Sequence, residues 1–222
     1  MLQWSDDERY LASASFGGEY TIREVPSLAV VMFQAVISRI KQVYFQPESQ
    51  LVFELDRKGN FEVKSRTSNK RIFTAKGSAW GDERLVEFAY HPNYDMLALA
   101  HRNGNIKLYR QFTLVDEIFA HQPLSNVVFN EAGTYLCCIC RESELLVYQT
   151  DNGKRDYVYA SAGLRQAQFI SNGLLRGLCW DLGSTRLETF DLASCTRTDS
   201  TPIPIPRNIA VLSADLKYLL YS

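Results

Sequence analysis

The chain has 222 residues, of which 46% are hydrophobic and 22% charged, and its 24 lysines and arginines nearly balance 25 aspartates and glutamates. Aromatic and aliphatic residues are plentiful enough to build a packed core, which excludes a disordered polymer. The net charge of -1 excludes attraction of the whole chain to nucleic acid or to an anionic membrane, so any such binding would need a local patch.

We expect no secretion signal from the first residues of the sequence. Met1 and Leu2 are soon followed by the acidic stretch 6–8, without the basic and apolar segments of a leader. The most apolar run, 28–37, falls well short of the roughly 20 residues that a membrane span needs. The five cysteines are an odd number, and three of them cluster within 137–140. We therefore expect reduced, buried thiols in a cytoplasmic or nuclear protein.

A unit of about 40 residues recurs along the chain. Each copy begins with an aromatic or apolar anchor, has apolar residues shortly after it, and carries Gly or Ser about 14 residues from the anchor. Alternating segments such as 61–64 and 106–109 follow, and their period of two predicts β-strands. Turn-forming residues separate these segments, so each copy is predicted to form four short strands. The anchors lie 39 to 45 residues apart, at Trp4, Phe45, Tyr90, Phe129, Phe169 and, in a weaker copy, Leu212.

Four strands per unit is typical of a propeller blade, and the chain resembles the WD-repeat β-propeller family along its whole length. The likeness is closest over 90–110, where an aromatic anchor and a His-Pro turn precede an apolar run, Gly104 and an alternating strand. Ala120-His121 stands where the family has Gly-His before the innermost strand. The resemblance implies an all-β fold of four-stranded antiparallel blades in a single domain.

The repeat spacing predicts five complete blades and part of a sixth. Their approximate ranges are 1–36, 38–76, 84–120, 124–160 and 164–205, followed by two strands of a sixth blade in 207–222. Each anchor closes the innermost strand of its blade. Because the N-terminus supplies no strand to complete the sixth blade, we expect the chain to be a fragment of a larger ring, or its missing strands to come from elsewhere. Alone, it would expose sheet edges.

Catalytic motifs are absent from the sequence. There is no nucleophile elbow and no phosphate-binding loop. His91 and His101 are predicted on turns at opposite ends of one strand, and His121 is predicted to cap a turn. Cys138 and Cys140 project to one face of a strand, but no two further ligands lie nearby, which favours core packing over a metal site. The chain is predicted to be no enzyme and to need no metal or cofactor.

Arginines recur at one position of the repeat. Arg57, Arg102 and Arg141 each lie 12 residues after an anchor, in the predicted turn between the second and third strands of a blade. Repeats place equivalent positions side by side, so these arginines are predicted to form an arc over blades two to four. The full set of candidate partner-binding residues is Arg39, Arg57, Lys58, Arg84, Arg102, Arg141, Arg165, Trp80 and Trp180.

Two interpretations of this arc stay open. Arginine forks bind carboxylate or phosphate groups bidentately, which predicts an acidic or phosphorylated peptide as the ligand. Alternatively, the arginines pair with nearby acids such as Asp56, Glu83 and Glu144 and only keep the surface solvated. Exposed tryptophans would favour binding, whereas buried ones would indicate packing.

The resemblance implies a non-catalytic scaffold that binds protein partners on its loop face within a multiprotein complex. The alternative is a propeller that gates a hydrolase of the prolyl-oligopeptidase kind, whose catalytic domain would lie outside this chain. A lactonase-like propeller would need acidic or histidine ligands on the innermost strands, which offer Gln42, Glu87, Asn126 and Gln168. No membrane partner is predicted, and nucleic acid is disfavoured because aromatic and basic residues do not interleave.

Overall fold

A computed structural model describes residues 2–5, 9–15, 18–35, 39–46, 48–77, 83–140, 144–151, 153–160, 163–181, 184–203, 210–212 and 219–221. The fold of this part of the chain is all-β, with antiparallel pairing in every sheet and one 3-10 turn, η1 (Pro92–Tyr94). None of the described segments forms a helix long and apolar enough to cross a membrane. The chain divides into two compact units, Met1–Leu85 and Val86–Ser222.

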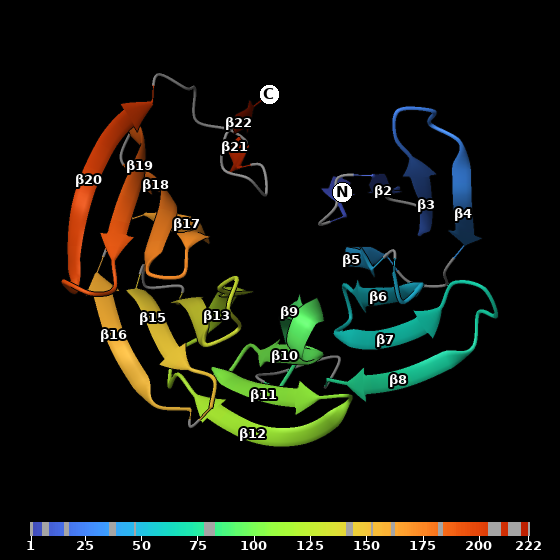
Figure 1. Ribbon diagram of the computed structural model, residues 1–222, viewed down its shortest axis with the longest axis horizontal. Helices are drawn as coiled ribbons and strands as arrows, with labels where there is room; N and C mark the ends of the chain where they lie inside the picture. Colours follow the sequence, from blue (N-terminus) through green and yellow to red (C-terminus); the bar gives the residue numbers. More distant parts are fainter. Residues whose placement is uncertain are drawn as a thin grey trace. The chain divides into compact units, whose positions relative to one another are not determined.

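The first unit contains two four-stranded sheets, each with its strands paired in chain order (Figure 1). The first sheet consists of β1 (Leu2–Trp4), β2 (Tyr10–Ala14), β3 (Glu19–Glu24) and β4 (Val30–Ala35). The second consists of β5 (Ile40–Gln46), β6 (Leu51–Asp56), β7 (Asn60–Ser65) and β8 (Arg71–Lys76). Between these sheets lies an apolar cluster that includes Ile22, Val43 and Val52, and the rings of Tyr10 and Phe45 meet edge to face at 5.2 Å.

The second unit contains three further four-stranded sheets and one pair of strands. The first of these sheets consists of β9 (Leu85–His91), β10 (Met96–His101), β11 (Asn105–Arg110) and β12 (Thr113–Phe119). The next consists of β13 (Leu124–Phe129), β14 (Tyr135–Cys140), β15 (Glu144–Gln149) and β16 (Arg155–Ala160). The third consists of β17 (Leu164–Ser171), β18 (Leu174–Asp181), β19 (Ser184–Asp191) and β20 (Thr196–Ile203), and the pair is β21 (Ala210–Leu212) with β22 (Leu219–Tyr221).

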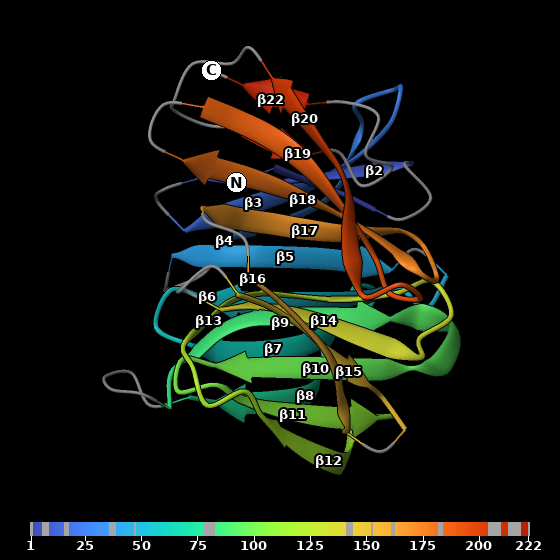
Figure 2. The same ribbon diagram turned by 90° about the vertical axis from the view of Figure 1, so that its left-hand side faces the viewer.

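The three complete sheets of the second unit follow one another in the same orientation. Their first strands, β9, β13 and β17, lie along one side of the unit, and their fourth strands, β12, β16 and β20, lie along the other (Figure 1). The sheets are twisted, so that β20 runs at a steep angle to β17 (Figure 2), as sheet twist accumulates from strand to strand.

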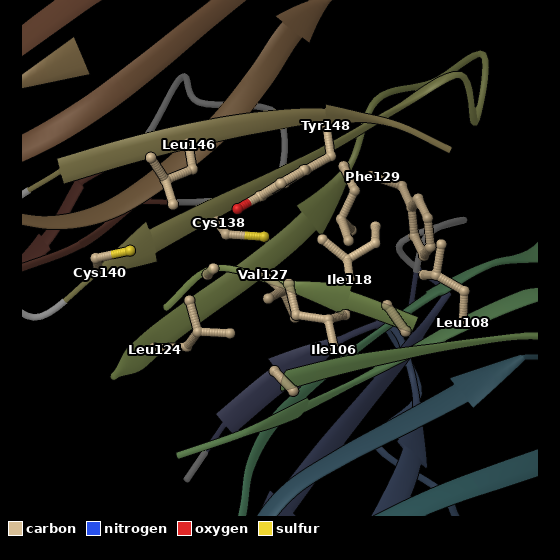
Figure 3. Close-up of a cluster of buried hydrophobic side chains, with 14 of the residues drawn as sticks. Ile106, Leu108, Ile118, Leu124, Val127, Phe129, Cys138, Cys140, Leu146 and Tyr148 are labelled. Carbon is tan, nitrogen blue, oxygen red and sulfur yellow. The ribbon is translucent and has the colours of Figure 1, made fainter. Parts of the chain in front are cut away.

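Strand β14 packs on both of its faces. Cys138 and Cys140 belong to an apolar cluster with Ile106 and Ile118 of the preceding sheet (Figure 3). Cys137 and Ile139 belong to a second cluster, which contains Leu164, Leu175 and Phe190 of the following sheet. Because side chains alternate across a strand, a strand between two other sheets needs apolar residues at every position, and 136–140 has them. The predicted core packing of Cys138 and Cys140 is confirmed.

The predicted repeat coincides with the sheets. Each of the first five anchors lies in the first strand of a sheet, and in the first three sheets the turn between the second and third strands contains the predicted glycine. Ser143 and Gly183, predicted for the next two turns, lie outside the described residues. Gly18, Gly59 and Gly104 have φ values of 93°, 85° and 89°, a region that glycine enters without the steric penalty of a Cβ. The weaker sixth copy corresponds to β21 and β22.

Polar side chains link successive sheets of the second unit. His91 is the last residue of β9 and is buried, not on a turn as predicted; its Nε2–H donates to the carbonyl of Glu131 at 2.8 Å. Asn130 follows β13 and is buried, and its amide nitrogen lies 3.4 Å from the side-chain oxygen of Asn172. Both residues come directly after an anchor, and both reach the turn after the first strand of the next sheet.

A buried ion pair lies inside the first unit. Glu54 on β6 accepts a hydrogen bond from Lys64 Nζ at 2.9 Å and one from the Tyr20 hydroxyl at 2.6 Å, and the exposed fractions of Glu54 and Lys64 are 5% and 7%. Burial and the Glu54 carboxylate raise the pKa of Tyr20, so the phenol stays protonated and donates. Lys64 Nζ also pairs with Glu62 at 3.2 Å, and the Tyr20 contact makes this charged group join strands of both sheets.

The cysteines offer a direct test of this packing. Cys195 is exposed in the turn between β19 and β20, whereas Cys137, Cys138, Cys140 and Cys179 are buried, and burial raises the pKa of the Cys137 and Cys138 thiols. Iodoacetamide is expected to label Cys195 in the native protein at least about 100-fold faster than the other four. Peptide mass spectrometry over a time course measures the rates, and all five thiols should react in urea. Rapid labelling of Cys138 without urea would contradict the packing of β14.

Candidate functional site

The turn between β6 and β7 presents two cations. Gly59 N–H donates to the Asp56 carbonyl at 3.1 Å, which closes the turn, and Asp56 Oδ1 accepts the N–H groups of Lys58 and Asn60 at 2.8 Å each. A side-chain oxygen that binds backbone N–H groups two and four residues ahead fixes a turn of this kind. Arg57 and Lys58 therefore stand at its tip, and both are exposed.

Two further arginines meet this turn. Arg57 N–H donates to the carbonyl of Arg39 at 2.8 Å, which places the residue before β5 beside the turn. The Arg84 guanidinium donates to the carbonyl of Arg57 through Nη2. We call the group Arg39, Arg57, Lys58 and Arg84 the basic corner; it lies wholly within the first unit.

Glycine at position 59 allows Arg84 to approach. A Cβ at Gly59 would lie 2.9 Å from Arg84 Cγ, closer than side-chain atoms normally come. The Arg84 Nε atom is buried and makes no hydrogen bond among the described residues. A buried donor of this kind carries a desolvation cost that an anion could relieve.

The basic corner gathers four cationic residues beside one carboxylate, Asp56. The Asp56 oxygens accept hydrogen bonds from two N–H groups of the turn and from the Asn60 side chain. Arg39, Arg57 and Lys58 are exposed and Arg84 is half-buried. Their backbone contacts hold the four residues within a distance comparable to the roughly 8–10 Å Debye length at physiological salt, so their fields add.

The second unit contains an equivalent turn. Arg102 is exposed between β10 and β11, Gly104 N–H donates to the His101 carbonyl at 3.1 Å, and Asn103 Oδ1 accepts Asn105 N–H at 3.0 Å. The geometry repeats that of the Arg57 turn, as the repeat predicted. Arg165 is exposed in β17, where the pairing with β18 is irregular between Leu164 and Gln166.

Other predicted residues do not join an observed cluster. Trp180 is half-buried near the end of β18, and its backbone N–H donates to the Gly163 carbonyl at 2.7 Å. Arg141 and Trp80 lie outside the described residues. The structure thus brings Arg39, Arg57, Lys58 and Arg84 together, while the arc over three repeats stays a prediction.

Two clusters of charged side chains lie within the sheets and were not predicted from the sequence. The Glu54–Lys64 pair is one, and Glu188 with Arg186 and Arg197 is another. A signal was available for Glu54, because it stands between the apolar residues of β6, where a solvent-exposed charge is unexpected. The partners could not be inferred, since they depend on which strands lie opposite.

The described ranges offer no candidate metal site. These residues contain no group of three or more His, Cys, Asp and Glu side chains that could hold a metal ion. His91 packs against Tyr94 and Phe129. The exposed His121 stacks on Phe119 beside a small depression of about 270 Å³.

The chain matches no model of a known protein family, and a search of curated protein sequences finds no significant match.

Proposed function

We propose that the chain is a non-catalytic interaction module of the β-propeller type, similar to WD-repeat proteins, and that it binds acidic or phosphorylated protein segments. The support for the architecture is that each of the first five repeats forms one four-stranded antiparallel sheet with its strands paired in chain order. Loops on such a rigid scaffold commonly carry binding sites.

The observation that carries the proposed ligand is the gathering of Arg39, Arg57, Lys58 and Arg84 at one end of the second sheet. Guanidinium groups bind carboxylate and phosphate oxygens through paired, charge-assisted hydrogen bonds. The turns already hold the backbone of these residues in the unbound protein. Ligand binding therefore loses little additional conformational entropy. Within its own unit, the Arg102 turn presents a cation at the equivalent position of the repeat.

Charge reversal tests this function. We expect Arg57→Glu to weaken binding of a fluorescent hexaglutamate peptide, and of a phosphoserine peptide of otherwise neutral sequence, by about tenfold or more, because it replaces a bidentate donor by a repelling charge. Fluorescence anisotropy at low and physiological salt measures the affinity. Lys70→Glu is the matched control, because Lys70 is an exposed cation near the start of β8, whereas the turn at Arg57 adjoins the other end of that strand. Equal losses for both variants would point to net charge alone, and unchanged affinity for Arg57→Glu would refute the proposal.

A further inference from the structure

Glu188 is a fully buried carboxylate on β19 with two arginine partners. Its exposed fraction is 0%, and its Oε1 atom accepts hydrogen bonds from Arg186 Nε at 2.7 Å and from Arg197 at 2.9 Å. A buried carboxylate is strongly destabilising when its cationic partners are removed. The two arginines are therefore a requirement of this sheet. They are themselves more accessible, with side-chain exposures of 22% for Arg186 and 54% for Arg197.

Ser200 stands directly opposite Glu188 on the neighbouring strand β20. The register pairs Ser200 with Glu188, Pro202 with Arg186, and Arg197 with Phe190. Residues opposite each other in an antiparallel pair project to the same face, with Cβ atoms about 4.5–5.5 Å apart. The Ser200 hydroxyl is thus on the face that carries Glu188 and both arginines, whereas Thr201 pairs with Leu187 and projects to the other face.

Strand β20 is accessible to another protein. Its residues from Thr196 to Pro202 are all exposed. It is the last strand in the described order of its sheet, β17-β18-β19-β20, so the edge away from β19 presents backbone groups to a partner. An extended segment with an exposed hydroxyl and an arginine three residues before it has the form of a protein kinase substrate.

We propose that Ser200 is a phosphorylation site whose modification draws Arg186 and Arg197 away from Glu188. In the reaction, the Ser200 hydroxyl oxygen attacks the γ-phosphorus of MgATP bound to a protein kinase. The bond from that phosphorus to the bridging oxygen of ADP breaks, the hydroxyl proton passes to a base of the kinase, and ADP leaves. The inference is independent of the basic corner, which belongs to the other unit.

The product places a phosphate of nearly two negative charges beside both guanidinium groups. Phosphate oxygens are strong acceptors for arginine, and the phosphate also repels the Glu188 carboxylate directly opposite it. Glu188 then shares or loses the two cations that it holds in the unmodified protein. The expected consequence is a weaker β19–β20 pairing, so that phosphorylation loosens this outer strand.

The experiment has a modification arm and a structural arm. The native protein is incubated with MgATP and a kinase that selects arginine three residues before its acceptor, and the site is located by peptide mass spectrometry. We expect phosphate on Ser200 and its loss in Ser200→Ala. Hydrogen exchange is then measured on the phosphorylated protein and on Ser200→Asp, and we expect β20 amides to exchange at least about tenfold faster than in the unmodified protein.

Two variants separate the proposed mechanism from simple damage to an edge strand. The Thr201 hydroxyl donates to Asp199 at 3.0 Å, so the control is made in an Asp199→Asn background, where no like charge adjoins position 201. There Thr201→Asp adds a charge on the opposite face and should leave β20 exchange within about twofold of the Asp199→Asn protein. Glu188→Gln removes the buried charge, so Ser200→Asp in that background should no longer accelerate exchange. Phosphate on Thr201 instead of Ser200, no phosphate on the native protein, or equal acceleration by Thr201→Asp would each overturn the proposal.

Discussion

Replacing Gly163 by alanine is expected to destabilise the second unit by about 3–4 kcal/mol. Gly163 precedes β17 with φ of 75°, a conformation that a residue with a Cβ adopts only with strain. A Cβ at this position would overlap the carbonyl group of Trp180, which is backbone and cannot rotate away as a side chain can. Relief would require β17 and β18 to separate at the point where Trp180 N–H binds the Gly163 carbonyl.

Gly173 provides the matched control for this substitution. It lies in the turn between β17 and β18, and a Cβ there would meet no atom within 4 Å. Gly173→Ala is therefore expected to change the free energy of unfolding by no more than about 0.5 kcal/mol. Urea denaturation followed by tryptophan fluorescence measures both variants. Similar stabilities for Gly163→Ala and Gly173→Ala would show that the tight approach of β17 to Trp180 does not exist in solution.

Removal of one partner from the buried Glu54–Lys64 pair is expected to have the second large effect. Lys64→Met leaves the Glu54 carboxylate buried at 5% exposure, with the Tyr20 hydroxyl still donating to it. Breaking a buried pair in this way typically costs about 3–5 kcal/mol, so the first unit should unfold at much lower urea concentration. Circular dichroism across a urea titration gives the free energy.

The double variant Glu54→Leu with Lys64→Met shows whether Lys64→Met loses stability through the uncompensated charge or through altered packing. Without the carboxylate, the methionine no longer leaves a buried charge uncompensated, and most of the lost stability should return, because apolar replacements of buried pairs are often neutral. Tyr20 would keep the side-chain oxygen of Gln34, 3.0 Å away, as an acceptor. A double variant as unstable as Lys64→Met would contradict the idea that the uncompensated Glu54 carboxylate causes the loss. The requirement would then be the lysine stem or its second partner, Glu62, which lies 3.2 Å from Nζ.

Much of the sheet order could be predicted because its signals are local. Alternating apolar residues give strands, and the glycine two residues after Arg57 or Arg102 gives a turn that needs positive φ. The basic corner followed in part from the repeat, since Arg39 and Arg84 occupy the same position relative to their anchors. The contact between Arg84 and the Arg57 carbonyl depends on the approach of a later strand and had no signal in the sequence.

The buried polar groups mark the limit of prediction from the sequence. His91 was expected on a turn because histidine followed by proline is common there, yet it ends β9 and packs against Phe129. Glu188 stands in a strand with mixed polarity, and only the register with β20 reveals that Arg197 reaches it. Such positions depend on contacts between elements distant in sequence or on exact strand register, so a strand pattern alone cannot identify them.

The polar contacts of His91 and Asn130 run from an earlier sheet of the second unit to a later one. His91 and Asn130 belong to an earlier sheet, and the groups that they bind belong to the turn of the sheet made next. During synthesis on the ribosome, each finished sheet therefore presents a donor whose acceptor has yet to emerge, and the next forty residues both cover its apolar face and satisfy that donor. Growth from the N-terminus would then proceed by stepwise docking, in which every new sheet completes the one before it.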